Sequence, residues 1–196
     1  MFSTTGVDFT GILGGISALV AIVYVQGQQR VLKNWYTQTA TVAFAVLVAY
    51  IWAPFGFPNS DWSRAPIGSD VVRLIPGLQF DPNLLTTNWL PVQVAIGAST
   101  YFLALIALFG DARRASITVI LIMGVGLELS QAFTNIAVNP IPPYRLDIHD
   151  VFVRALGVLI MYGIFSLVAA LYRWKVPARG QRYGFSGFVD ALIRRI

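Results

Sequence analysis

Five long apolar runs, separated by polar segments, constrain this sequence more than any other feature. They cover residues 11–26, 36–52, 91–109, 116–133 and 150–172. A helix needs about 20 mostly apolar residues to cross the hydrocarbon core of a bilayer. The mean hydropathy of +0.66 and the 56% share of hydrophobic residues argue against a soluble domain. The sequence therefore predicts an all-α, polytopic transmembrane bundle of about five spans.

Proline and basic residues set the expected limits of these spans. Pro54 is expected to end the second span, because proline disrupts a helix interior, and Pro91 suits the first turn of the third. No Lys or Arg precedes Arg30, so the first run lacks the basic region of a signal peptide and is expected to be a retained span. The long connection at 54–90 is expected to be an ordered loop that touches lipid or covers a site.

The basic residues predict an orientation in the membrane. Ten of the fourteen fall on one side of the bundle, in two loops and the tail: Arg30, Lys33, Arg113, Arg114, Arg173, Lys175, Arg179, Arg182, Arg194 and Arg195. The opposite side holds Arg64, Arg73 and Arg145, with Arg154 just inside the fifth span. Since cytoplasmic loops carry the excess of Lys and Arg, we expect the N-terminus outside and the C-terminus inside a bacterial cytoplasmic membrane.

The chain divides into a transmembrane domain, residues 1–175, and a cytoplasmic tail, residues 176–196. In the tail, Phe185, Phe188 and Leu192 recur at helical spacing beside basic residues. This pattern predicts an amphipathic helix lying in the membrane interface. A helix that docks onto a partner subunit is the alternative.

Polar residues gather in one part of the chain, from the end of the fourth apolar run into the fifth. The candidate site residues are Glu128, Gln131, Arg145, Asp147, His149, Asp150 and Arg154. A charge inside the membrane costs about 2.5–3.5 kcal/mol and is usually paired within the protein. Arg154, at a depth similar to that of Glu128, is one candidate partner, for which Asp150 competes, and Arg145 is the other.

Two interpretations of these residues remain open. In one, Glu128, Asp150 and Arg154 form a satisfied network that only fixes two helices together. In the other, the cluster is a polar pocket open to the outer leaflet, where carboxylates such as Asp147 supply an acid and a base and Arg145 holds a phosphate or carboxylate. His149 would be a proton carrier or simply an exposed loop residue.

Several classes of chemistry are excluded or unsupported. The absence of cysteine excludes disulfides and thiol catalysis, and a single histidine excludes bis-histidine haem ligation within the chain. The spacing of Asp147, His149 and Asp150 matches no specific metal signature, so we expect no metal and no other cofactor. No nucleophile elbow, phosphate-binding glycine loop or H-E-x-x-H motif occurs, and nothing establishes an enzyme. The net charge of +5 indicates cytoplasmic anchoring rather than nucleic-acid binding.

The polar segment resembles the VanZ-like family of bacterial membrane proteins. That family's pattern is E-x-x-Q, then R-x-x-D-x-x-D, two apolar residues and N-x-x-G, and it is matched here by Glu128, Gln131, Asp147, Asp150 and Gly157. Arg145 matches with one residue fewer before Asp147, Arg154 stands where the family usually has asparagine, and Met161 replaces a second glycine. The resemblance covers the last three spans and the loop at 52–55. It implies a cell-envelope protein of a family associated with resistance to glycopeptide antibiotics such as teicoplanin.

Two functions follow as hypotheses. The first is an envelope protein that binds or modifies an outer-leaflet lipid or a lipid-linked cell-wall precursor through the polar cluster. The second is a non-catalytic accessory subunit that packs its spans against a larger membrane complex. The partners are then membrane lipid, a lipid-linked precursor or other membrane subunits, and no nucleic acid.

Overall fold

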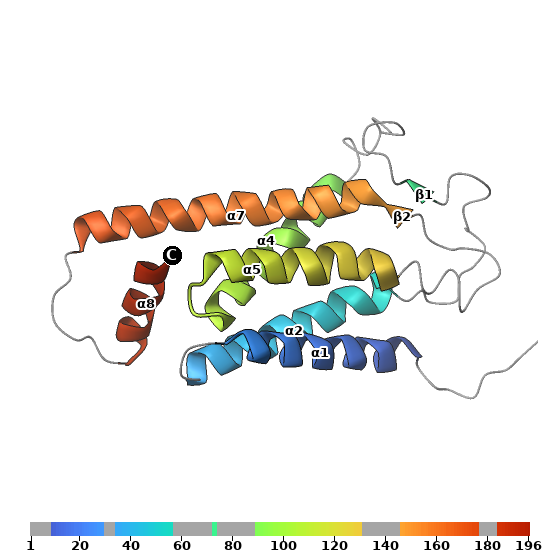
Figure 1. The fold of residues 1–196 in the computed structure, drawn as a ribbon, viewed down its shortest axis with the longest axis horizontal. Coiled ribbons are helices and arrows are strands. Elements are labelled where there is room, and N and C mark those ends of the chain that lie inside the picture. Colours follow the sequence, from blue (N-terminus) through green and yellow to red (C-terminus); the bar gives the residue numbers. More distant parts are fainter. Residues whose placement is uncertain (1–8, 30–33, 57–71, 74–88, 131–145, 177–183) are drawn as a thin grey trace, which may run out of the picture.

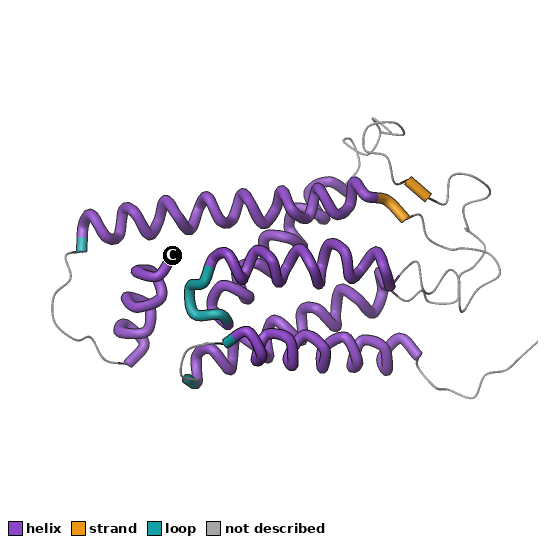
Figure 2. Tube along the Cα trace, in the orientation of Figure 1, coloured by secondary structure: helices purple, strands orange, loops and turns teal. Residues whose placement is uncertain are grey.

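The described part of the chain is almost entirely helical. The computed structural model describes residues 9–29, 34–56, 72–73, 89–130, 146–176 and 184–196. Its helices are α1 (Phe9–Gln28), α2 (Trp35–Gly56), α4 (Trp89–Ala107), α5 (Ala112–Val119) with the π-helical segment η3 (Ile120–Gly126), α7 (Ile148–Lys175) and α8 (Gly184–Arg195) (Figures 1 and 2). The predicted all-α class is confirmed for these residues, with two two-residue strands as the exception.

Each of the five predicted apolar runs is a helix in the structure, and so is the predicted tail helix. The expected limits hold to within a few residues, except at the end of the second run. Pro54 does not end α2, which continues to Gly56. Only two residues of α2 follow Pro54, so the one hydrogen bond that its missing N–H removes affects only the last turn. The fourth run is helical from Ala112 through Ser130, and its expected end at 131–133 lies outside the described residues.

The helices form an elongated bundle in which successive members run in opposite directions (Figure 1). α1 packs on α2, α2 on α4, and α4 on α7, while α5 and η3 lie against α4 and α7. Because the directions alternate, the α1–α2 turn, the α4–α5 turn and the end of α7 all lie at one end of the bundle (Figure 1).

At the opposite end a short strand pair joins two distant segments. β1 (Val72–Arg73) and β2 (Leu146–Asp147) are parallel, with Val72 opposite Leu146 and Arg73 opposite Asp147. β2 leads directly into α7, so this pair ties part of the long 54–90 connection to the start of that helix. The rest of that connection, apart from the ends of α2 and α4, lies outside the described residues.

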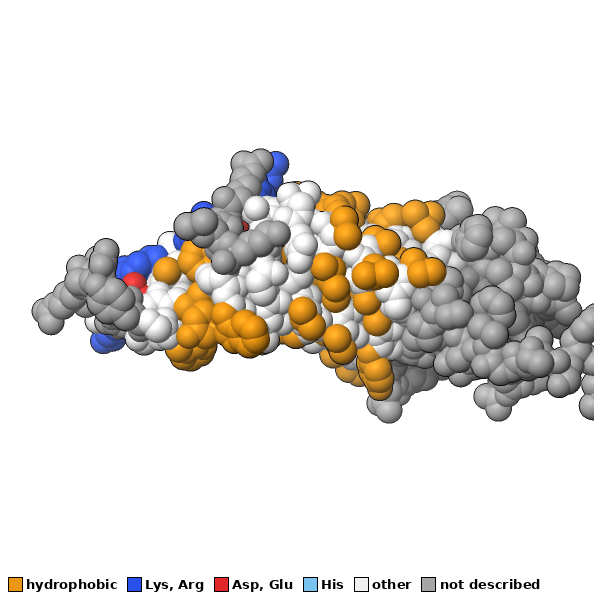
Figure 3. All heavy atoms as spheres, turned by 90° about the horizontal axis from the view of Figure 1, so that it is seen from below, with side chains coloured by type: hydrophobic (Ala, Val, Ile, Leu, Met, Phe, Trp, Pro, Cys, Tyr) orange, Lys and Arg blue, Asp and Glu red, His pale blue; other side chains and the backbone are white. Residues whose placement is uncertain are grey.

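Two helices in the described residues are long and apolar enough to cross a membrane: Leu90–Ala107 of α4 and the whole of α7. The core helix of a soluble protein passes the same test. Burial distinguishes such a helix, which is mostly buried, from a membrane-spanning helix that faces lipid. In α4, 44% of the apolar window is buried, whereas in α7 only 17% is. Figure 3 shows apolar side chains over the middle of the bundle surface.

Apart from Arg73 and Arg154, the described basic residues gather at one end of the bundle. Arg113 and Arg114 begin α5, Arg173 and Lys175 end α7, and Arg194 lies in α8 (Figure 3). Arg30, Lys33, Arg179 and Arg182, which were assigned to the same side, lie outside the described residues.

The tail helix α8 turns its apolar side toward its own bundle. The ring of Phe188 lies 4.7 Å from that of Tyr36 and 5.6 Å from that of Phe109, measured between centroids. Leu192 is 9% exposed, and its carbonyl oxygen approaches the positive-φ turn at Gly110. The predicted amphipathic helix therefore exists, and part of its apolar face packs against the basic end of the protein.

Candidate functional site

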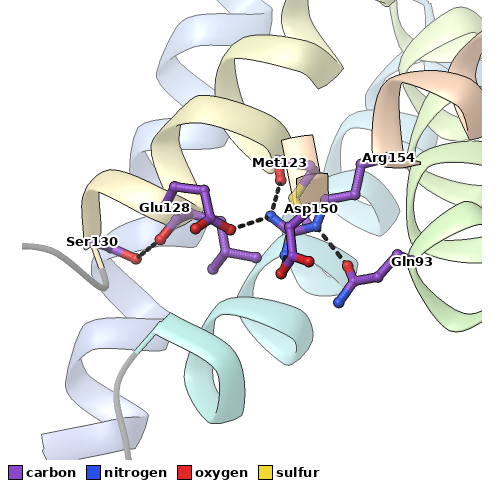
Figure 4. Close-up of polar contacts among 7 residues, drawn as sticks. Gln93, Met123, Glu128, Ser130, Asp150 and Arg154 are labelled. Atoms are coloured by element: carbon purple, nitrogen blue, oxygen red, sulfur yellow. Dashed lines mark hydrogen bonds and ion pairs between the residues drawn. The ribbon is translucent and has the colours of Figure 1, made fainter. Parts of the chain in front are cut away.

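Arg154 is the centre of a buried polar network between the helices. Its side chain lies on α7 and is 2% exposed. Nε donates a hydrogen bond to Oε1 of Gln93 (2.7 Å), and Nη1 donates to the Met123 carbonyl (3.0 Å). Nη1 also donates to Oε1 of Glu128 and Nη2 to Oδ2 of Asp150, both at 3.0 Å (Figure 4). Both carboxylates are therefore ion-paired with one guanidinium.

Four segments supply these partners. Asp150 lies in the first turn of α7, four residues before Arg154, which places both side chains on one helix face. Gln93 comes from the start of α4, and Met123 from η3. Glu128 follows in the helical residues that continue η3. The network thus joins α4, α7 and the α5–η3 helix at the end opposite the basic residues.

Glycines allow α4 and α7 to approach closely at this level. A Cβ atom added to Gly97 would lie 2.8 Å from the carbonyl carbon of Arg154, nearer than real Cβ atoms come. A Cβ atom at Gly157 would lie 3.0 Å from the backbone nitrogen of Ala98 and closer still to the Val94 carbonyl. These two contacts, one helical turn apart, bring the α7 backbone against α4 and hold Arg154 within reach of Gln93.

The network is nearly closed to outside ligands. Four of the five N–H groups that a guanidinium offers make the hydrogen bonds described above. The side chains of Glu128 and Asp150 are 12% and 16% exposed. Two carboxylates and two neutral acceptors thus surround the buried guanidinium and accept its hydrogen bonds. Arg154 therefore organises the helices and has little capacity left to hold a phosphate.

The structure brings three of the predicted site residues together: Glu128, Asp150 and Arg154. His149 lies in the first turn of α7 and is half-buried. Asp147 is described only through its backbone in β2, and Gln131 and Arg145 lie outside the described residues. Among the described residues, no group of three or more His, Cys, Asp or Glu side chains is arranged to hold a metal ion.

Sequence reasoning missed Gln93, Gly97 and the Met123 carbonyl. Gln93 carried a usable signal, because it is a polar residue two positions after the proline that opens an apolar helix. Gly97 lies four residues later on the same face and is the kind of small residue that permits close helix contact. The role of Met123 depends on its backbone and carries no side-chain signal.

Comparisons with protein-family models, with curated proteins and with solved structures find no match to this chain. The class that the fold and site define is therefore an all-α helical bundle with a buried arginine–carboxylate network. The likeness to the VanZ-like family stays a resemblance of motif.

Proposed function

We propose that this protein is a five-span integral membrane protein of the bacterial cell envelope that resembles the VanZ-like family. Its function is to bind an outer-leaflet lipid or a lipid-linked cell-wall precursor at the end of the bundle that contains the Arg154 network. The observation that carries this proposal is the convergence, at that end, of the buried network and the strand pair that joins Arg73 and Asp147.

The exposed apolar surface supports membrane insertion. Along α7 the large exposed hydrophobic residues are Phe152, Leu156, Leu159, Ile160, Tyr162, Ile164, Leu167, Val168, Leu171 and Trp174. Leaving a large apolar side chain in water rather than burying it costs about 1.5–3 kcal/mol, so a helix of this kind is far more stable in lipid. The similarly exposed Leu19 and Val23 of α1 and Val46 of α2 support extending the assignment to those helices.

The charge distribution supports the orientation. The end formed by the α4–α5 turn, the end of α7 and α8 carries the described exposed arginines and Lys175. By the positive-inside rule that end is cytoplasmic, which places the Arg154 network and the strand pair near the outer face.

Binding, rather than catalysis, is the activity that this geometry favours. Arg154 is occupied by Glu128, Asp150, Gln93 and the Met123 carbonyl, so it serves as a fixed support. In this proposal the main ligand contact comes from Arg145, which belongs to the same sequence motif. A guanidinium binds phosphate in bidentate fashion, and phosphate is common to anionic lipid head groups and lipid-linked precursors.

Native mass spectrometry of the full chain, extracted in mild detergent, tests this proposal. We expect a co-purifying phosphate-containing lipid or lipid-linked precursor whose occupancy falls several-fold in Arg145→Gln. The matched control is Arg64→Gln, which removes an arginine from the same predicted side but outside the motif. Equal occupancy in the wild type and in Arg145→Gln would contradict the proposed site.

The second candidate function is that of an accessory subunit in a larger membrane complex. The observation that favours it is the exposure of α7, because only 17% of its apolar window is buried within the chain. In the same mild-detergent extraction this function predicts one stable, larger assembly. A single chain with bound lipid supports the first function instead.

A further inference from the structure

Two cavities follow one another along the same pair of helices, α1 and α5–η3. The larger, of about 480 Å³, lies at the basic end of the bundle, and Tyr24, Gln28, Asp111, Arg113, Arg114 and Thr118 are among its lining residues. The other, of about 290 Å³, lies farther along both helices, and its lining includes Ile16, Val20, Leu121 and Ile122. α1 packs mainly on α2, which leaves this groove beside α5 and η3 open to the surroundings.

The lining residues recur at helical spacing on both sides of the groove. On α1 they are Val20, Tyr24 and Gln28, each one turn from the next. On α5 and η3, Ile117 and Thr118 of the first cavity are followed one turn later by Leu121 and Ile122 of the second. The two cavities are therefore sections of one groove that changes from polar to apolar.

Within the described part of the chain, the polar section contains one cation without an ion-pair partner. Arg114 is fixed, because its Nη1 donates to the Gln28 carbonyl (3.0 Å) and its Nε lies 3.2 Å from Oδ2 of Asp111. Asp111 also caps α5 by accepting from the Arg114 backbone N–H. Arg113 is exposed and has no ion-pair partner in the described part of the chain. The section therefore carries a net positive charge held by an available guanidinium.

The length of the groove matches one leaflet of a bilayer. Along α1 the lining extends from Gln28 to Ile16, twelve residues apart, which at 1.5 Å per residue is about 18 Å from the polar end to the apolar end. Half of a hydrocarbon core about 30 Å thick is about 15 Å. A ligand that fills the groove must have an anionic head at Arg113 and an apolar chain reaching Val20 and Ile122.

We propose that this groove binds one anionic phospholipid of the leaflet at the basic end of the bundle. The phosphate receives hydrogen bonds from Arg113 and from the Tyr24 hydroxyl, while an acyl chain lies along Val20, Ile117 and Leu121. The site rests on the proposed membrane insertion, but it is independent of the lipid or precursor site proposed at the opposite end.

Lipid titration of the purified full chain, followed by native mass spectrometry, tests the proposal. The probes are phosphatidylglycerol and phosphatidylcholine with identical acyl chains. We expect phosphatidylglycerol to bind more tightly than phosphatidylcholine, and Arg113→Gln to weaken its binding by about tenfold, the factor for one charge-assisted contact. The matched control Arg173→Gln removes an exposed arginine at the same end but outside the groove, and it should leave the binding unchanged.

Further experiments distinguish binding of the lipid head group from binding of the acyl chain. They also distinguish this site from the one proposed at the opposite end of the bundle. Val20→Trp, which fills the apolar section, should also weaken phosphatidylglycerol binding, and soluble glycerol phosphate should not compete. Arg145→Gln should leave this binding intact, so the two proposed sites can fail separately. Equal binding of both lipids, equal losses in Arg113→Gln and Arg173→Gln, or competition by glycerol phosphate would each overturn the proposal.

Discussion

The contribution of the Arg154 network to folding can be measured by removing its charges singly and together. In Arg154→Asn the guanidinium is lost, and Glu128 and Asp150 lose the cation that they share. Breaking a buried ion pair by removing one partner costs about 3–5 kcal/mol. At roughly 2–4 °C per kcal/mol for a chain of this size, the melting temperature should fall by about 6–20 °C.

Glu128→Gln should cost less, because Arg154 keeps Asp150, Gln93 and the Met123 carbonyl. We expect a loss of about 1.5–3 kcal/mol, the usual contribution of a hydrogen bond to a charged group. In the double variant Glu128→Gln with Arg154→Asn, one of the two carboxylates that lose the guanidinium is replaced by a neutral amide. Its total loss should therefore fall short of the sum of the single losses by about 0.5–3 kcal/mol, the coupling found between contacting residues.

Thermal melting in detergent, followed by intrinsic fluorescence, measures all three variants. Arg173→Asn is the control, since it makes the same substitution on an exposed part of the same helix and should change stability by no more than about 0.5 kcal/mol. If the two single losses simply add in the double variant, Glu128 and Arg154 do not stabilise each other and the network is wrongly described.

Three other predictions test packing, the tail and orientation. Gly97→Ala should destabilise the protein by about 1–3 kcal/mol, because the new methyl group meets the α7 backbone, whereas Gly163→Ala, with open space around it, should be neutral or stabilising in the same melting assay. Truncation after Lys175 should leave the protein in the membrane fraction while lowering its melting temperature, since α8 covers the end of the bundle; loss from the membrane would contradict this. A topology reporter fused after Ile196 should be active only in its cytoplasmic form, and one inserted near Ser60 only in its external form, and the reverse pattern would overturn the orientation.

The positions of the helices could be predicted because hydropathy alone sets them. A run of apolar residues needs no knowledge of its neighbours to be recognised, which is why α1, α2, α4 and α7 lie where expected. The expectation that α2 ends at Pro54 was wrong by two residues, because a proline in the last turn of a helix interrupts little of the helix.

The candidate site was only partly predictable. The similar depth of Glu128 and Arg154 in the sequence made Arg154 a candidate partner beside Arg145, and the structure shows the pair with Arg154. Gln93 depends on how α4 packs against α7, which no local pattern specifies. The position of α8 against Tyr36 and Phe109 likewise depends on the assembled bundle rather than on its amphipathic pattern.

The π-helical segment η3 keeps one line of side chains on the buried side of its helix. Ala115, Val119, Met123 and Leu127 are all buried, although four-residue steps in an α-helix drift by about 40° each. A π-helical turn contains more residues than an α-helical turn, so four-residue steps within it rotate in the opposite direction. The rotation in η3 therefore offsets that in α5, and all four side chains face the bundle interior. Compared with an α-helix of the same length, the segment between Ile120 and Gly126 therefore contains one extra residue. Shortening this segment by one residue would restore ordinary α-helical winding and keep Glu128 directed at Arg154. The same deletion between Arg154 and Gly157 in α7, which has no extra residue, would rotate Arg154 by about 100° relative to the contact of Gly157 with α4.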